Sequence, residues 1–231
     1  MAEYLYEVDK DCALCGKSFR VTKVRSRLIK IKQDTDFCTY YKDVNPYYYS
    51  IWACPHCGYA APDTHFDEIH SAAKDKLTKF LTERKVNVNF CGTRTRDQAI
   101  ATYKLAIFYN ELLEVAASKI GGLYLKLAWL YREGEQQEQE QAALAKAVEY
   151  YEKALFRERL PLGNMTEVTL TYLVGDLFKR SGNTDKAIPY FNKIISSQQA
   201  KMERNIYNLA REVWQEIRDA RKQTAADEVA E

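Results

Sequence analysis

The sequence predicts a mainly α-helical protein with a small antiparallel β module at its N-terminal end, and three observations support this prediction. Four of the six cysteines form two CxxC pairs. The residues around these pairs are rich in β-branched and aromatic types, which suit strands. Beyond residue 62, apolar and small residues recur at helical spacings. We therefore expect two domains, a zinc-ribbon-like β module over residues 1–62 and an α-helical, tetratricopeptide-like domain over residues 63–231.

Two CxxC pairs, each followed at once by a glycine, are the strongest chemical signal in the chain. They are Cys12-Ala-Leu-Cys15-Gly16 and Cys54-Pro-His-Cys57-Gly58. Glycine lets the backbone turn tightly enough for amide N–H groups to face the thiolates. Four thiolates around one Zn²⁺ form a closed tetrahedral site without an open position for substrate. The spacing therefore predicts a structural zinc ion held by Cys12, Cys15, Cys54 and Cys57.

A thioredoxin-like redox site is the alternative to a metal site. Such a site has one CxxC on a βαβ pattern, whereas this chain has two pairs and no such pattern. In a reducing compartment, paired CxxC motifs favour metal binding over disulfides. Cys38 and Cys91 lack the spacing of the pairs and are expected to be small buried hydrophobes. His56 lies inside the second pair, where it is a poor ligand to the same metal.

Strands are expected around the cysteine pairs. From Arg20 to Lys32, β-branched and apolar residues interleave with basic ones, which predicts a hairpin. Aromatic residues then cluster between Tyr40 and Trp52, and Asn45-Pro46 marks a turn between two strands. The two CxxC pairs are thereby placed at the turns of a small antiparallel sheet, as in a zinc ribbon.

The chain becomes helical beyond residue 62. Thr64 and Asp67 give a weak capping signal at the start of an apolar stripe over residues 66–80. After a polar stretch at 83–93, Thr95 and Gln98 form a capping box that opens a long helical run. Breaks in the helical pattern are expected at three places: 121–122, 161–164 and 181–183.

Small and aromatic residues recur in the helical region at tetratricopeptide spacings. In such repeats the small residues lie where two antiparallel helices cross closely, and the aromatic residues fill the space toward the next helix pair. The clearest copy consists of Val174, Gly175, Phe178, Gly182, Ala187, Phe191 and Ile194. A second copy consists of Leu127, Ala128, Tyr131, Ala147, Tyr151 and Ala154. Its helices are separated by a Glu/Gln-rich run at 135–141, expected to be a solvated helix end or linker. An ordinary helical bundle is the alternative interpretation.

A series of short motifs marks the N-terminal part of the chain. It comprises Cys12-x-x-Cys15-Gly16, Asp34-x-Asp36, Tyr41, Asn45-Pro46, Tyr49, Cys54-Pro55-x-Cys57-Gly58-Tyr59-Ala60-Ala61 and Phe66. With this series the chain resembles a bacterial family of unknown function, in which a zinc-ribbon-like segment precedes tetratricopeptide-like helices. The resemblance covers nearly the whole chain, and the segment over residues 54–61 is its most specific part. It implies a fold and a zinc site, but no activity.

Several function classes lack support in the sequence. The net charge of +2 gives no overall attraction to nucleic acid or membrane. No apolar run approaches the ~20 residues that span a bilayer, and the N-terminus lacks the pattern of a secretory signal. No nucleophile elbow, phosphate loop or HExxH motif is present, and Asp34 and Asp36 have no companion ligand at motif spacing. We therefore expect a cytosolic protein without enzyme activity, without a membrane partner and without a cofactor other than Zn²⁺.

Two binding functions remain, and recognition of a protein or peptide is favoured. The inward faces of the repeat helices carry aromatic and basic residues that suit a peptide with an acidic end. These groove candidates are Trp129, Arg132, Tyr172, Lys179, Tyr207 and Arg211. Nucleic-acid binding through the basic strand and its neighbouring tyrosines is the alternative. Its candidates are Arg20, Lys23, Arg25, Arg27 and Lys30. The sequence thus predicts a scaffold or adaptor protein.

Overall fold

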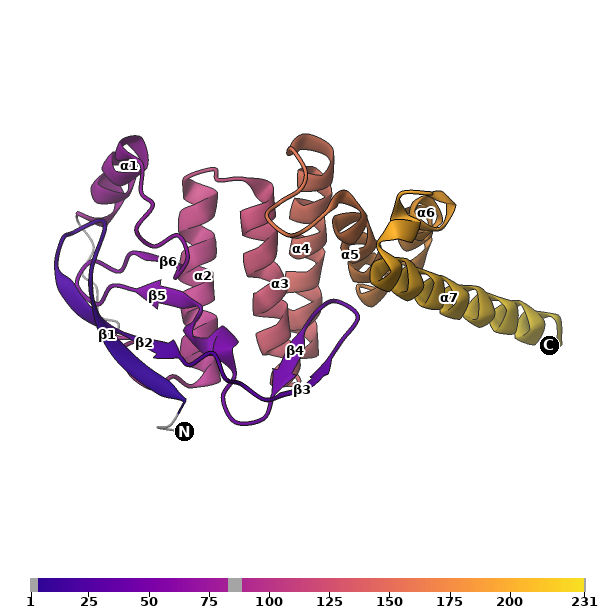
Figure 1. The fold of residues 1–231 in the computed structure, drawn as a ribbon, viewed down its shortest axis with the longest axis horizontal. Helices are drawn as coiled ribbons and strands as arrows, with labels where there is room; N and C mark the ends of the chain where they lie inside the picture. The colour runs from indigo at the N-terminus through magenta and orange to yellow at the C-terminus, as the bar shows by residue number, and fades with distance from the viewer. Residues whose placement is uncertain (1–3, 83–88, 231) are drawn as a thin grey trace. The chain divides into compact units, whose positions relative to one another are not determined.

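The computed structural model describes residues 4–82 and 89–230, with side chains up to residue 223. Within these residues, seven α-helices and six short strands follow one another in the order shown in Figure 1. The protein is mainly helical with a small antiparallel β part near the N-terminus, which confirms the predicted fold class. Two compact units divide the chain, unit 1 over residues 1–143 and unit 2 over residues 144–231. The expected boundary between residues 62 and 63 lies inside unit 1 and stays a prediction.

Three two-stranded antiparallel sheets form the β part of unit 1. The pairs are β1 (Leu5–Asp11) with β2 (Ser18–Val24), β3 (Lys30–Gln33) with β4 (Thr39–Tyr41), and β5 (Ile51–Ala53) with β6 (Ala60–Pro62). The hairpin predicted from Arg20 to Lys32 is wrong, because β2 pairs back with β1 and β3 pairs forward with β4. A tight CxxC turn brings together the strands on either side of it, whereas residues 25–29 connect two different sheets. Both CxxC pairs lie at strand turns, as predicted.

The aromatic cluster lies partly in strands, with Tyr40 and Tyr41 in β4 and Trp52 in β5, but the tyrosines between them form a short 3-10 helix. This helix, η1 (Pro46–Tyr49), begins after Asn45, whose side-chain oxygen accepts a hydrogen bond from the backbone N–H of Tyr47 at 3.0 Å. The fixed φ of proline and its missing N–H suit the first position of a helical turn. Asn45-Pro46 therefore marks a turn between β4 and β5, but the tyrosines that follow it belong to a helix, and Tyr49 is buried.

The first α-helix starts later than its sequence signals indicate. α1 (Ser71–Leu81) begins after His70, so Phe66 and the predicted cap at Thr64 precede it. The Thr64 hydroxyl lies 2.7 Å from Nδ1 of His65 instead of capping a helix. Phe66 is fully buried, and this burial explains why an apolar residue stands at that position outside the helix. The polar stretch expected at 83–93 falls partly outside the described residues.

Two long helices and the start of a third complete unit 1. They are α2 (Arg96–Leu112), α3 (Ala117–Glu133) and the first turns of α4 (Gln137–Arg157). α2 opens with the predicted capping box of Thr95 and Gln98. Gly121-Gly122 lies inside α3, so the break predicted there is wrong, and the chain turns at 113–116. Figure 1 shows α2 and α3 side by side, with β5 and β6 against α2.

An aromatic cluster around Phe66 joins the sheets to α2. The ring of Phe66 lies 5.8 Å from that of Phe19, 5.7 Å from that of Trp52 and 5.2 Å from that of Tyr59. From α2, the hydroxyl of Tyr109 donates a 2.9 Å hydrogen bond to the carbonyl of Gly58. Burial of these rings contributes apolar area and edge-on ring contacts at once. The sheets β1–β2 and β5–β6 therefore share one aromatic cluster, and the second CxxC turn is hydrogen-bonded to α2.

Unit 2 contains the rest of α4 and three further α-helices. These are α5 (Glu167–Arg180), α6 (Thr184–Ser196) and α7 (Arg204–Ala230), with a short 3-10 helix η2 (Ala200–Met202) before α7. The predicted breaks at 161–164 and 181–183 coincide with the α4–α5 and α5–α6 connections. α5 and α6 pack closely, because a Cβ atom added to Gly175 would lie only 3.1 Å from the side chains of Tyr190 and Phe191. Glycine permits this close crossing.

Candidate metal centre

The four cysteines of the two CxxC pairs come together in unit 1. One ligand atom from each of Cys12, Cys15, Cys54 and Cys57 lies within 4.8 Å of all the others. Across the two pairs, the sulfur of Cys12 lies 3.6 Å from that of Cys57, and the sulfur of Cys15 lies 3.8 Å from that of Cys54. Cys12 and Cys54 are buried. This cluster can hold a metal ion, and no histidine or carboxylate belongs to it.

The two turns that carry these cysteines have the same local structure. In the first, the N–H of Gly16 donates to the carbonyl of Cys12 at 2.8 Å; in the second, Gly58 donates to Cys54 at 2.9 Å. Both glycines have positive φ, 71° and 78°, a region that other residues adopt at a cost. Each turn also closes a strand pair, since the N–H of Cys12 donates to Lys17 and that of Cys54 donates to Tyr59.

The sulfur atoms are close enough to change one another's ionisation. The pKa of Cys54 is lowered, because the thiols of Cys12 and Cys57 can donate hydrogen bonds to its thiolate. The pKa of Cys57 is raised, because its own proton is then held between Cys12 and Cys54. Backbone N–H groups of His56 and Cys57 further favour the Cys54 thiolate. A bound cation would remove the cost of ionising all four sulfurs together.

The cysteine and histidine residues excluded from the predicted ligand set lie outside this cluster. Cys38 is buried near Asp36, and burial raises the pKa of its thiol to about 12. Cys91 is half-buried, and burial also raises its pKa. Nε2 of His56 lies 3.1 Å from the carbonyl oxygen of Ser18. His56 thus links the second CxxC turn to the start of β2 without belonging to the sulfur cluster.

A second group of charged residues, here called the Arg132 cluster, ties the β3–β4 hairpin to α3. Arg132 pairs with Asp36 at 2.7 Å, with Asp34 at 3.1 Å and with Glu140 at 2.7 Å. The indole N–H of Trp129 donates to Asp36 at 3.0 Å. The side chain of Asp36 is 0% exposed, so its charge depends on these partners. The two aspartates are therefore used in a structural ion-pair network.

The partners of Asp34 also change its ionisation. Burial alone would raise the pKa of this carboxyl group, but the hydroxyl of Tyr40, at 2.9 Å, and the ammonium of Lys32 outweigh burial and lower the pKa. The Arg132 guanidinium acts in the same direction. The pKa of Arg132 is itself raised, because hydrogen bonds and charge from Asp36 and Glu140 exceed the cost of burial.

Comparisons with known proteins show the family of this chain. The sequence profile of a family described as "Uncharacterized protein conserved in bacteria (DUF2225)" matches residues 5–217. The chain belongs to this family. One relative is an uncharacterized protein of Borreliella burgdorferi, 29% identical over 152 residues that make up 55% of this chain and 53% of the relative. The chain thus spans about half the length of that relative. No solved structure matches this chain.

Three of the six groove candidates of this DUF2225 protein are not available to line an open groove, because Trp129 and Tyr172 are buried and Arg132 is held in ion pairs. Trp129 and Arg132 face the β3–β4 hairpin within unit 1, and Tyr172 is completely buried in unit 2. That part of the groove prediction is wrong, because helical spacing places a residue on a face without showing what covers the face. The other three candidates are more accessible. Lys179 pairs with Glu216 at 2.6 Å, and Arg211 lies over the ring of Tyr207.

The nucleic-acid candidates of this family member lie on two sheets and the segment between them. Arg20 pairs with Glu7 and Asp9 across β1 and β2. Lys23 lies over the ring of Trp52, and Arg25 over that of Tyr6. Arg27 and Lys30 are exposed. The basic residues therefore do not form one continuous strand, because β2 ends at Val24.

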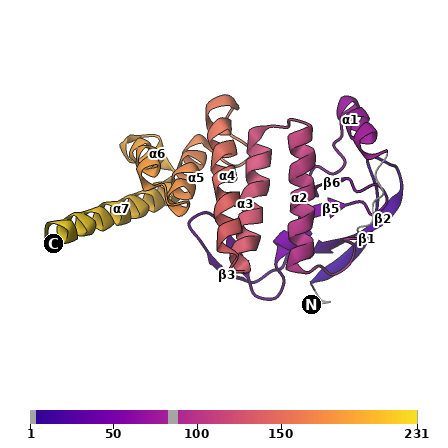
Figure 2. The ribbon, with the colours of Figure 1, turned by 180° about the vertical axis from the view of Figure 1, so that it is seen from behind.

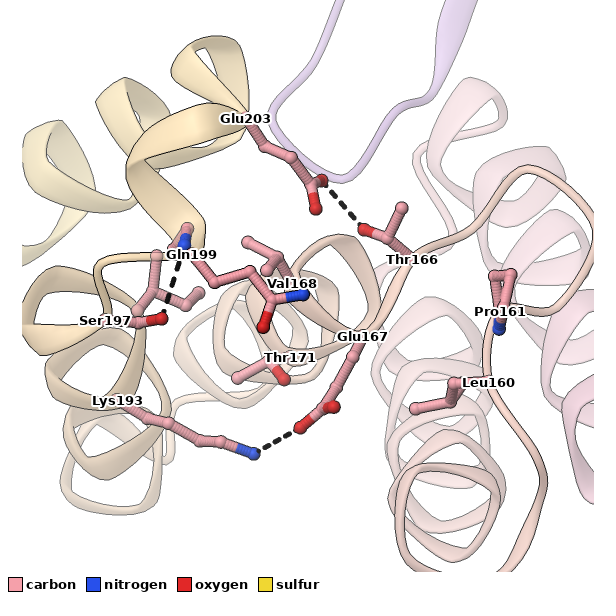
Figure 3. Close-up of a pocket in the computed structure, with 12 residues that line it drawn as sticks. Leu160, Pro161, Thr166, Glu167, Val168, Thr171, Lys193, Ser197, Gln199 and Glu203 are labelled. Atoms are coloured by element: carbon pink, nitrogen blue, oxygen red, sulfur yellow. Dashed lines mark hydrogen bonds and ion pairs between the residues drawn. The ribbon is translucent and has the colours of Figure 1, made fainter.

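Unit 2 carries a cavity that the sequence did not indicate. It has a volume of about 440 Å³ and lies among the α4–α5 connection, α5, the end of α6 and η2. Figure 3 shows Lys193 and Glu167 joined at one rim and the Thr166 hydroxyl bonded to Glu203 at another. Thr171, also drawn there, is 2% exposed, and its hydroxyl has no partner.

Among the described helices, none is both long and apolar enough to cross a membrane.

Proposed function

We propose that this protein is a non-enzymatic interaction protein of the bacterial cytoplasm whose β part is stabilised by zinc. The observation that carries the zinc part of the proposal is the spacing of the four sulfurs. A Zn–S bond is about 2.3 Å long, so the sulfurs of a tetrahedral site lie about 3.8 Å apart. The Cys12–Cys57 and Cys15–Cys54 distances of 3.6 and 3.8 Å fit this value.

The chemistry of the ligand set supports a structural role for the metal. Four cysteine ligands fill every position of a tetrahedral ion, so that no position is left for a substrate or a reactive water. In small metal-binding modules the metal contributes about 10 kcal/mol or more to folding. The sheets β1–β2 and β5–β6 are each only two strands wide, and such sheets are marginal without further support. A bound zinc ion would link the CxxC turns of these two sheets.

Thiol reactivity separates zinc binding from the redox alternative. In the native protein a zinc site masks Cys12, Cys15, Cys54 and Cys57, and a chelator exposes all four to a thiol reagent. A dithiol–disulfide redox site predicts reactive thiols before any chelator is added. Masked thiols that are released together with zinc support the proposal, and four thiols that react at once in the untreated protein contradict it.

We infer that protein recognition uses the surface between α6 and α7. A hollow of about 590 Å³ there is lined by Ile195, Asn208, Arg211, Glu212, Trp214, Gln215, Glu216 and Asp219. Trp214 supplies the kind of large ring that anchors interfaces. Three acidic residues and one basic residue line the hollow, so a basic peptide segment fits it better than the acidic one expected from sequence. The close α5–α6 crossing at Gly175 supports a tetratricopeptide-like unit, a class that binds peptides in this manner.

Affinity capture from nuclease-treated and untreated lysate tests this assignment. Partners should survive nuclease and be lost from Trp214→Ser, while Met202→Ser, a matched change at a residue that is 85% exposed in the same unit, should retain them. Partners that vanish with nuclease would favour nucleic-acid binding instead. Phosphate contacts also weaken steeply as salt rises, which gives an independent measure of that alternative.

A further inference from the structure

Two isoleucines on and beside strand β3 are unusually exposed. Ile29 is 55% exposed and Ile31 is 64% exposed, and they are the most exposed large apolar side chains among the described residues of unit 1. Exposing such side chains to water forgoes the free energy of burying them. Every residue of β3 is exposed, and the strand pairs along one edge only, with β4. Ile31 within β3 and Ile29 just before it are therefore left uncovered by the residues of unit 1 that the structure describes.

The exposed isoleucines lie within a basic segment. Residues 25–32, here called the basic–isoleucine segment, contain Arg25, Arg27, Lys30 and Lys32 and no acidic residue. Arg25 packs over Tyr6, and Lys32 pairs with Asp34 at 3.3 Å. Arg27 and Lys30 are exposed. The net charge of the whole chain is near neutral, and for this reason no membrane partner is expected from the sequence. The positive charge of this segment is local.

The Arg132 cluster fixes the C-terminal end of this segment to α3. Asp34 and Asp36 directly follow β3, and both bind Arg132 on α3. Figures 1 and 2 show the β3–β4 hairpin beside α3 in both views. The ring of Tyr47 lies 5.0 Å from that of Trp129, and its hydroxyl accepts a hydrogen bond from the backbone N–H of Thr39 in β4 at 3.1 Å. A buried, ion-paired base next to an exposed strand makes a preorganised surface, so that little ordering cost is left for binding.

We propose that the basic–isoleucine segment docks the protein on an anionic lipid surface. Lysine and arginine side chains are attracted to anionic headgroups, and adjacent apolar side chains enter the boundary of the acyl region. A lipid surface is the occupant that uses both the cations and the isoleucines. A second copy of the segment would bring like charges together, and lysines on an edge strand oppose such pairing. Nucleic acid would leave Ile29 and Ile31 without a role.

Vesicle co-sedimentation of the full, zinc-loaded chain tests the proposal. We expect binding to vesicles of phosphatidylcholine with phosphatidylglycerol, and weak binding to phosphatidylcholine alone. Ile29→Ser with Ile31→Ser should lower the affinity about tenfold or more, because the apolar contribution is removed. Lys30→Glu should lower it as well and should reduce its salt dependence. All three positions are exposed, so the variants should keep their zinc content and unfolding midpoint.

Phe156→Ser is the control, because Phe156 is an apolar residue that is 74% exposed but lies in unit 2, outside the basic–isoleucine segment. It should bind vesicles as the wild type does. Absence of binding to anionic vesicles overturns the proposal. The proposal is also overturned if the isoleucine changes leave vesicle binding unaltered. In that case, binding of single-stranded oligonucleotides through Arg27 and Lys30 would assign the segment to nucleic acid.

Discussion

Replacing Arg132 with leucine should destabilise unit 1 by about 3–5 kcal/mol, the usual cost of breaking a buried ion pair by removing one partner. The magnitude follows from burial. The side chain of Asp36 is 0% exposed and that of Arg132 is 16% exposed, so the change leaves a buried carboxylate without its cation. Trp129 and the N–H of Cys38 still donate hydrogen bonds to Asp36, which keeps the loss within this range.

Urea unfolding followed by tryptophan fluorescence measures this loss. A Trp214→Phe background leaves Trp52 and Trp129, both in unit 1, as the reporting fluorophores. Arg20→Leu is the matched control, because Arg20 is 69% exposed and its pairs with Glu7 and Asp9 are worth at most about 1 kcal/mol. Equal losses for the two arginine variants would refute the reasoning, since Asp36 would then have to be solvated. Combining Arg132→Leu with Asp36→Asn should recover part of the loss.

Three further predictions follow from single residues. Thr171→Val should leave the free energy of unfolding unchanged or raise it by up to about 1 kcal/mol, because the buried hydroxyl has no partner; a clear loss in thermal unfolding would show that it has one. Gly16→Ala should cost about 1 kcal/mol and speed zinc loss to a chelator, because φ is 71° there although space is free. The folded-state pKa of Asp34 is lowered, so its contribution to stability is present above about pH 4 and is lost as the pH falls through the folded value. The stability difference between wild type and Asp34→Asn should therefore be constant above about pH 4 and shrink below it, and a difference that grows in acid would contradict this.

The sequence predicts what is determined locally. The CxxC turns, the capping box at Thr95 and the breaks near Pro161 and Gly182 each depend on a few adjacent residues, and the structure contains them all. Helix and strand classes also follow from short-range spacing. The four-cysteine cluster could be predicted for the same reason, because two identical turns with matching ligands imply a shared site.

Partners that are distant in the sequence could not be predicted in this way. Arg132 and Asp36 are 96 residues apart. No spacing pattern in the sequence indicates that they form an ion pair. Helical periodicity likewise placed Trp129 and Tyr172 on a face, but packing covers both. The sequence does not distinguish Ile29 and Ile31 from buried strand residues, since only the tertiary structure shows that they are exposed.

The zinc content of the purified native protein and of Cys54→Ser tests the central claim most directly. Elemental analysis should find one zinc ion per chain in the wild type and none in stoichiometric amount in Cys54→Ser. Cys38→Ser, which changes a cysteine outside the cluster, should keep the metal. A wild type without zinc, or a Cys54→Ser variant with the normal amount, would contradict the account.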